Sequence, residues 1–401
     1  MQVARELGVE AVLIGTVSHR GNNLIVQVDL LNGENGSSLW TKQYEDDFNN
    51  LVQVQEDISR KLIQELRLNL TPEQSSRLTK RYASNSAAYQ HYLMGRYYWN
   101  KRTPEGLISA AEQFQAAKDK DRNYALAYSG LADCYLLLEE YAGTPISETL
   151  PKARAAAQRA VDIDDSLAEA HTSLAKARQH SWEWPSAETE YRRAIGLNPK
   201  YPTARQWYSG LLIDRGRLDE ALMQIKAAQE LDPVSPIIIG NVGYTYFLKG
   251  DLAAAQSEYN KLIEQDPTFP VGHAVLGLLY LKQARSEEAI AELQKAVKFS
   301  GRSGHALSAL GYAYAVSGKH KEARLIIQEL ETKYQQKKTS ATNLAGVFAG
   351  LEEKDQAFTW LEKDFQARSY ELTRLASEPL FDTLRSDPRY ANLLQRMGLA
   401  R

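Results

Sequence analysis

Cysteine is almost absent from this sequence. Cys134 is the only one among 401 residues, so no disulfide forms within the chain and no paired-cysteine metal site exists. Cys134 lies between Ala132 and Tyr135 in a predicted helix, where a small buried side chain is more common than a reactive thiol. The use of cysteine therefore does not indicate whether the protein resides in an oxidising or a reducing compartment.

Long apolar runs and an excess of one charge are also lacking. No stretch of about 18 apolar residues could span a membrane, and the first residues lack the apolar core of a signal peptide. The net charge is −2, so no general basic field attracts nucleic acid. We expect no membrane insertion and no nucleic-acid partner. The default compartment is cytoplasmic; the alternative is periplasmic, if a longer parent protein has an upstream membrane helix.

The motifs of common enzymes are missing as well. Gly318-Lys319 is followed by His320, not by the Ser or Thr of a phosphate-binding loop. No metal-binding Asp-Phe-Gly and no His-Glu-x-x-His occurs. His171 and His273 occupy positions of the repeat described below that are usually bulky and packed, which favours a structural role over metal binding. The sequence therefore predicts no enzyme activity, no catalytic residue, no metal and no cofactor.

What the sequence does contain is a fixed period. Alanines recur at one constant step over more than a third of the chain, and small residues followed three positions later by an aromatic keep the same step. The step is about 34 residues, which is typical of stacked helix–turn–helix units. An alanine has no side chain beyond Cβ, so each marks the same close crossing of two helices. The recurring residues are Ala187, Ala221, Ala255, Ala289, Ala323 and Ala357, with Gly243, Gly277, Gly311 and Tyr246, Tyr280, Tyr314 in register.

The order of these residues resembles the tetratricopeptide repeat (TPR). In that family an aromatic, a Leu-Gly pair and a Tyr lie on the first helix, two alanines lie on the second, and a proline ends the unit. Pro199, Pro233 and Pro267 fit the last position. The resemblance implies a mainly α fold, a right-handed superhelix of helix pairs that builds a binding surface rather than a catalytic cleft.

The first seventy residues have a different period. Val12 to Val17, Leu24 to Leu31 and Leu39 to Tyr44 alternate as short strands, and Leu51, Val54, Ile58, Leu62 and Leu66 return to helical spacing. We predict three antiparallel strands and an amphipathic helix. A sheet this thin has an open edge and a small core, which suggests that an upstream strand and helix are missing.

Three stretches of this region, 4–17, 39–44 and 54–58, resemble the rear of a TolB-amino-terminal-like (FlgO-like) domain. That domain precedes TPR units in bacterial sensors and regulators, which often carry a serine/threonine kinase, nucleotide-cyclase or winged-helix domain at the front. The predicted organisation is a partial α/β domain over 1–70, a helical linker over 71–87, about eight TPR units over 88–368 and a C-terminal helical cap over 369–401.

In TPR proteins, positions 2, 5, 9 and 12 of the first helix line the concave groove. Carried over to this chain, these positions are polar in the early units and apolar or aromatic in the middle units. Lys176 is the one cation among the positions considered, which disfavours a clamp for a peptide's terminal carboxylate. Either the middle positions form an exposed strip for a partner, or the curvature of the solenoid buries them against one another. The candidate partner-binding residues are Ile237, Tyr244, Phe247, Leu278, Leu281 and Tyr312.

The sequence thus predicts a non-catalytic scaffold or sensory module that binds a protein or peptide in the groove. The alternative is the rear regulatory region of a larger kinase, cyclase or winged-helix transcription regulator. The stretch Trp182-Glu183-Trp184-Pro185 lies in a turn between helices, and its two tryptophans are expected to fix that turn.

Overall fold

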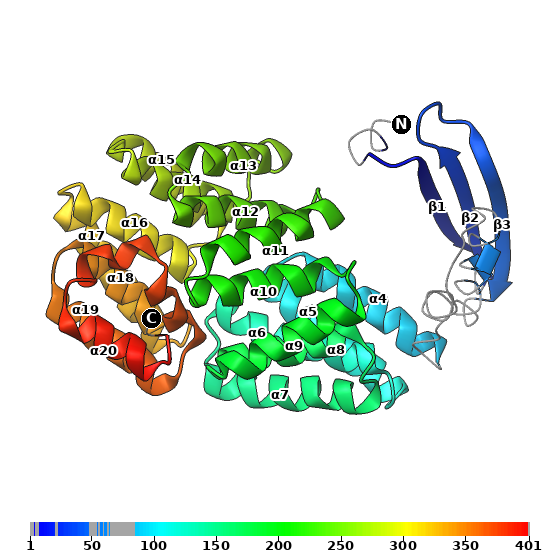
Figure 1. The fold of residues 1–401 in the computed structure, drawn as a ribbon, viewed down its shortest axis with the longest axis horizontal. Coiled ribbons are helices and arrows are strands. Elements are labelled where there is room, and N and C mark those ends of the chain that lie inside the picture. The colour runs from blue at the N-terminus through cyan, green and yellow to red at the C-terminus, as the bar shows by residue number, and fades with distance from the viewer. Residues whose placement is uncertain are drawn as a thin grey trace.

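The computed structural model describes residues 8–20, 23–47 and 85–399, together with residues 4, 54, 57, 58, 60, 61 and 64. It shows a small sheet at the N-terminal end, a long array of helix pairs and a C-terminal segment folded back into that array (Figure 1). The predicted fold class is confirmed: the chain is mainly α, with an α-solenoid behind a small β element.

The sheet has three antiparallel strands in the order β1-β2-β3. These are β1 (Ala11–Arg20), β2 (Asn23–Asn32) and β3 (Ser38–Asp47), close to the predicted limits. Val26 and Val28 form a small core with the helical residue Val54. Residues 71–84 of the predicted linker over 71–87 lie outside the described residues, as do Leu51, Leu62 and Leu66 of the predicted amphipathic helix.

Sixteen helices alternate as eight antiparallel pairs between residues 86 and 367 of the described chain. The pairs are α4 (Ser86–Asn100) with α5 (Pro104–Lys120), α6 (Ala125–Ala142) with α7 (Ile146–Ile163), α8 (Ala168–His180) with α9 (Trp184–Leu197), α10 (Pro202–Asp214) with α11 (Leu218–Leu231), α12 (Pro236–Lys249) with α13 (Leu252–Gln265), α14 (Pro270–Lys282) with α15 (Ser286–Phe299), α16 (Gly304–Val316) with α17 (His320–Gln335), and α18 (Ala341–Gly350) with α19 (Lys354–Ala367).

Close helix crossings explain the fixed period of the sequence. All six periodic alanines are fully buried. The periodic glycines are just as constrained, because a Cβ on Gly277 would lie 2.4 Å from Leu293 Cγ and one on Gly243 would lie 2.8 Å from the ring of Tyr259. Neither position has room for a larger side chain.

The turns inside the pairs also repeat with this period, but the repeat is visible in the backbone conformation and not in the residue types. One residue per turn has a positive φ, a conformation that glycine adopts freely and other residues adopt at a cost. Half of these positions are not glycine, so glycine spacing alone does not show the pattern. The positions are Trp182, Gly216, Gly250, Ala284, Gly318 and Glu352, each one repeat length after the last.

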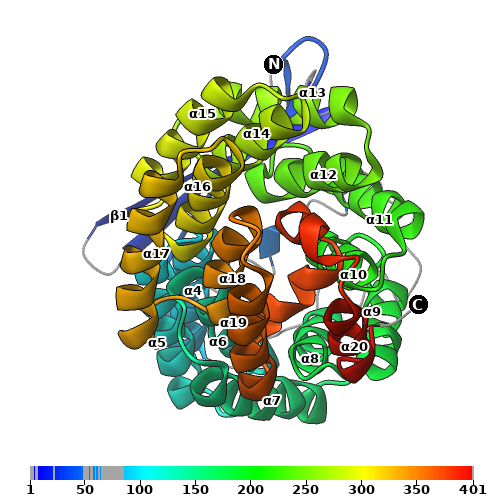
Figure 2. The ribbon, with the colours of Figure 1, turned by 90° about the vertical axis from the view of Figure 1, so that its left-hand side faces the viewer.

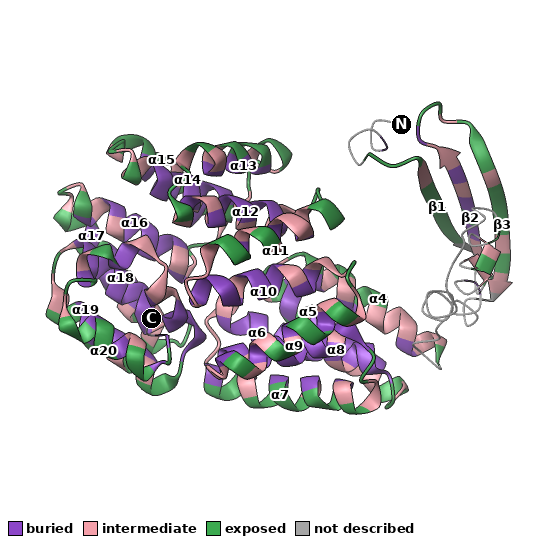
Figure 3. Cartoon of the chain, viewed as in Figure 1, coloured by how far each residue is buried: buried purple, intermediate pink, exposed green. Residues whose placement is uncertain are grey.

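The first and second helices of each pair differ in burial (Figure 3). The second helix buries one stripe, as in α9, where Trp184, Ala187, Tyr191 and Ala194 are the buried residues. The first helix is buried on several sides, and in α18 all ten residues are buried. A helix that is apolar all round must be covered all round, so the first helices are packed on their inner side as well.

The array winds into a nearly closed ring (Figure 2). A Cβ on Gly143, at the end of α6, would lie 2.5 Å from the backbone of Lys338, which precedes α18. Lys337 and Glu148 form an ion pair across the same junction at 3.3 Å. The second and eighth pairs are therefore neighbours in space.

Inside this ring lies the C-terminal segment, which we define as residues 369–399. It contains the 3-10 helices η2 (Tyr370–Ala376) and η3 (Pro379–Leu384) and the helix α20 (Pro388–Arg396). Figure 2 shows η2 and η3 within the ring rather than stacked on its end. Leu372, Leu375 and Leu384 are fully buried, so the segment covers the inner side of the first helices.

The close crossings make a specific stability prediction. Replacing Ala289 by Leu should overpack the crossing of α14 and α15 and lower the free energy of unfolding by about 1–3 kcal/mol. Ala253→Leu is the matched control, because Ala253 is an exposed alanine on α13. Urea denaturation measures both. Equal stability of wild type and Ala289→Leu would contradict the assigned helix register.

Candidate partner-binding groove

The inner face of the ring is the groove that the repeat register predicts, and the C-terminal segment lies along it. The segment contacts the inner ends of α6, α8, α10, α12, α14, α16 and α18. It begins at Ser369, whose backbone N–H donates to the carbonyl of Asp364. The Asp364 carboxylate also accepts two backbone N–H bonds at the start of α18, which fixes the point where the segment enters the ring.

Tyr370 is the first anchor of the segment. Its ring stacks on His180 with 3.9 Å between centroids. Its hydroxyl accepts hydrogen bonds from Lys176 Nζ at 3.1 Å and Gln179 Nε2 at 3.3 Å, and its backbone N–H donates to Glu139 at 2.9 Å. Residues of α6 and α8 thus hold one tyrosine in a polar pocket.

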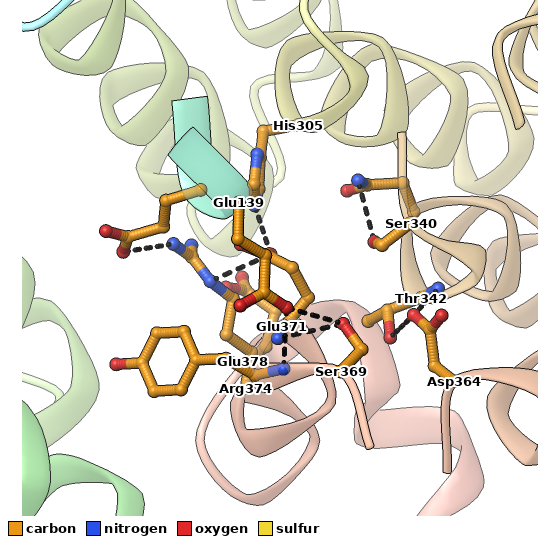
Figure 4. Close-up of polar contacts among 12 residues, drawn as sticks. Glu139, His305, Ser340, Thr342, Asp364, Ser369, Glu371, Arg374 and Glu378 are labelled. Atoms are coloured by element: carbon orange, nitrogen blue, oxygen red, sulfur yellow. Dashed lines mark hydrogen bonds and ion pairs between the residues drawn. The ribbon is translucent and has the colours of Figure 1, made fainter. Parts of the chain in front are cut away.

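A buried ionic cluster is the second anchor (Figure 4). Glu371 pairs with His305 on α16 at 2.5 Å and with Arg374 at 3.3 Å, and Arg374 also reaches Glu140 on α6 at 3.6 Å. Burial alone would raise the pKa of Glu371, but the charges of His305 and Arg374 lower it to about 2. Because the Glu371 carboxylate is buried, it depends on these partners for its charge, and the cluster ties the segment to both α6 and α16.

The predicted groove residues lie farther along the segment. The hydroxyl of Tyr244 donates to Glu378 at 3.1 Å, and Phe247 packs beside Tyr244 with 6.4 Å between ring centroids. Leu278, Leu281 and Tyr312 line one pocket of about 210 Å³, together with Lys282, Val316, and Pro379 and Leu380 of the segment. Ile237 is half-buried near the start of α12, away from this pocket's lining.

Two features of the site differ from what the sequence suggested. Lys176 is not an exposed groove cation: it is 5% exposed, with its ammonium 4.4 Å from the centre of the Tyr370 ring. Trp184 does more than fix its own turn, because its Nε1–H donates to the carbonyl of Met397 at 2.8 Å. Neither role could be read from the local sequence, since both partners belong to the C-terminal segment, far away along the chain.

The two histidines at packed repeat positions have equivalent surroundings. The Nδ1 atoms of His171 and His273 lie 2.6 Å from Glu190 and Glu292, and their Nε2 atoms lie 2.9 Å from backbone carbonyls. Each ring therefore ties the first helix of its pair to the second helix and to the preceding turn. Within the described residues no group of His, Cys, Asp and Glu has the arrangement of a metal site.

The groove also buries several carboxyl groups. Asp214, which accepts a hydrogen bond from Gln179 at 2.7 Å, has its pKa raised to about 6 by burial. Burial likewise raises the pKa of Glu139 and of Glu378.

Among the helices that the structure describes, none has the length and apolar character of a membrane-spanning segment.

Comparison with known proteins agrees with this architecture. Models of the tetratricopeptide repeat match residues 172–236, 238–269 and 274–337. The solved structure of the human IFIT1 dimer with m7Gppp-AAAA superposes with a TM-score of 0.50 at 18% identity, covering 88% of this chain and 84% of that one. This likeness concerns the fold alone. The chain contains tetratricopeptide repeats.

Curated relatives share part of the chain. A "putative adenylate cyclase 3" of Rhizobium meliloti is 28% identical over 193 residues, 47% of this chain and 32% of the relative. The transcriptional regulator HilA of Salmonella typhimurium is 26% identical over 160 residues, 40% of this chain and 29% of the relative. The matched part is thus about a third of each relative's length.

The ionic cluster predicts a large effect for a small change. Glu371→Gln should lower the free energy of unfolding by about 1.5–3 kcal/mol, because the buried carboxylate loses its charged contacts with His305 and the partly exposed Arg374. Glu148→Gln, which removes one side of an exposed ion pair, should cost less than about 1 kcal/mol. Urea denaturation compares them. Similar small losses in both would show that the segment does not depend on the cluster.

The buried carboxyl group of Asp214 should make the free energy of unfolding depend on pH. Its carboxyl holds a proton more tightly in the folded chain, where its pKa is about 6, than in the unfolded chain at about 3.8. The stability that this proton contributes is present below about pH 4 and is lost as pH rises through about 6, by up to about 3 kcal/mol. Asp214→Asn keeps an acceptor for Gln179 without the titration.

The measurement is urea denaturation of both proteins from pH 4 to pH 7.5. Because other groups titrate equally in both, the difference between them isolates Asp214, and the variant should gain stability relative to wild type as pH rises. A difference that is constant with pH would contradict the raised pKa.

Proposed function

We propose that this chain, which contains tetratricopeptide repeats, is a non-catalytic scaffold that binds a protein or peptide partner on its inner face. TPR scaffolds typically bind proteins. The partner binds in the groove beside the C-terminal segment. The residues around this part of the groove are Ile237, Tyr244, Phe247, Leu278, Leu281 and Tyr312.

The observation that carries this proposal is that the inner face already holds a peptide segment. Between Tyr370 and Asp382 the side chains of the segment dock at separate points on α8, α12, α14 and α16. The docking chemistry is an aromatic ring on a polar pocket, acidic groups on His305 and Lys282, and apolar side chains between them. A surface with these features suits a peptide partner.

Room for a partner remains beside the segment. The pocket of about 210 Å³ has one wall from α14 and α16 and another from Pro379 and Leu380. Val316, at its rim, is 46% exposed. A space of this size suits one apolar side chain of a partner. Aromatic and aliphatic anchors in such pockets contribute most of the binding energy in many interfaces.

A second candidate function follows from the relatives. The matched parts of the putative adenylate cyclase and of HilA are about a third of each protein. The chain is then the rear regulatory region of a larger cyclase, kinase or transcription regulator, with the sheet at its front as the remnant of a TolB-amino-terminal-like domain. Groove binding would serve such a protein as its signal input.

Site-specific photo-crosslinking tests the location of binding. A photoreactive phenylalanine analogue at Val316 should capture a partner from native lysate, because this position borders the pocket. The same analogue at Leu325, 64% exposed on the neighbouring helix α17, is the matched control and should capture little.

The captured protein should also be lost when Leu281→Glu, which places a charge in the pocket wall, is added to the Val316 variant. Adducts that are equally strong from positions 316 and 325, or that persist with Leu281→Glu, would place the partner elsewhere on the surface.

A further inference from the structure

A second polar region lies at the opposite end of the inner face, on the first helix pair. Arg96 belongs to α4, and Arg102 lies in the turn that follows it. Both guanidinium groups pack on Trp99, with distances from guanidinium carbon to ring centre of 4.3 Å and 3.5 Å. The two guanidinium carbons are therefore no farther apart than the sum of these two distances. One tetrahedral oxyanion can span such a gap and accept hydrogen bonds from both groups.

Neither arginine has an acidic partner among the described residues. No ion pair and no hydrogen bond joins Arg96 or Arg102 to another described side chain, although both are half-buried. Many arginines in the described part of the chain are paired: Arg217 holds Glu188 and Glu220, and Arg396 holds Glu362. A half-buried cation without a counter-charge is costly, so two of them against one tryptophan call for an explanation.

The nearby carboxyl groups are engaged elsewhere. Asp133 accepts a hydrogen bond from Ser173 Oγ at 2.6 Å, and Glu140 lies 3.6 Å from Arg374 of the C-terminal segment. Burial raises the pKa of Asp133 to about 7, so near neutral pH about half of it is uncharged. Burial has the largest effect on Arg102 and lowers its pKa. The charge of Arg96 lowers this pKa further, whereas Tyr141 raises it. Burial lowers the pKa of Arg96 as well, but Tyr92, Tyr201, Asp133 and Glu169 together raise it by more. The two cations therefore lie in the field of nearby acidic groups, although within the described chain none of these groups forms an ion pair with them.

Buried donors without a partner occur on α4 and on the neighbouring helix α6. Trp99 is 3% exposed, yet its Nε1–H has no hydrogen-bond partner in the described chain. Ser129, one helical turn before Asp133 on the facing helix α6, is 2% exposed and its hydroxyl also lacks a partner. Buried polar groups are nearly always satisfied, so such exceptions call for an explanation. A bound oxyanion would accept hydrogen bonds from donors of this kind.

We propose that Arg96 and Arg102 form a binding site for a phosphate group on the inner face of the ring. The planar fork of each guanidinium matches the oxygens of a phosphate, and two cations without a direct ion pair match its charge of nearly −2 near neutral pH. A carboxylate, with a single charge, would leave one guanidinium unbalanced. The phosphate comes either from a small molecule or from a phosphorylated side chain of a partner.

Isothermal titration calorimetry of the full chain with inorganic phosphate tests the site. Wild type should bind one equivalent, and Arg96→Gln and Arg102→Gln should each weaken binding about 10- to 100-fold, the value of one charge-assisted hydrogen bond. Arg159→Gln, which changes an exposed arginine on α7, is the matched control and should leave affinity unchanged. Arg102→Lys keeps the charge without the fork and should lie between wild type and Arg102→Gln, so the test survives if a glutamine variant does not fold.

Two further arms identify the source of the phosphate. A phosphoserine peptide that binds at least tenfold more tightly than inorganic phosphate, while its unphosphorylated form does not bind, indicates a phosphorylated partner; equal affinities indicate a free small molecule. Acetate at the same ionic strength should not compete. The proposal is overturned if wild type shows no saturable phosphate binding, if acetate binds as well as phosphate, or if both glutamine variants and the lysine variant retain wild-type affinity.

Discussion

The covering of the inner face by the C-terminal segment is the contact on which the rest of this structure depends. Helices such as α18 are buried on every side, and a helix apolar all round is stable in water only when every face is packed. The second helices cover the outer side, and residues 369–399 cover the inner side. The segment does this with buried leucines and with the buried carboxylate of Glu371, which pairs with the partly exposed Arg374. A buried carboxylate without its partners is costly, so the ion pairs of Glu371 favour this position of the segment in the ring.

The sequence was sufficient to predict the helix pairs. Period and residue size are local properties of the sequence. The alanine that recurs in every repeat marks each helix crossing, and a glycine such as Gly277 marks a position where a side chain would collide. Neither signal requires knowledge of the ring. The three strands were predicted for the same reason, because alternation is also local. The turns were only half visible, since Trp182, Ala284 and Glu352 adopt the conformation that glycine shows elsewhere in the series.

The site was harder to predict because its partners are far apart in the sequence. Register identified which residues face the groove, and Leu278, Leu281 and Tyr312 do meet around one pocket. Register carries no information on what lies opposite. Lys176 was expected at an open surface, yet it is buried under Tyr370, 194 residues away. The C-terminal segment has no period, so its expected role as a cap over the last unit gave no sign that it enters the ring. Arg96 and Arg102 fell outside the candidate set because their importance lies in the absence of a partner, which a sequence does not show.

The central claim is that residues 370–384 are packed inside the ring in the free protein. Hydrogen–deuterium exchange of the full chain, followed by mass spectrometry, tests it most directly, because buried and hydrogen-bonded amides exchange far more slowly than those of an exposed tail. We expect peptides covering η2 and η3 to exchange as slowly as peptides from α12, α14 and α16, with which they are packed. Exchange of these peptides within seconds, while the helices stay protected, would contradict the account and leave the inner face open.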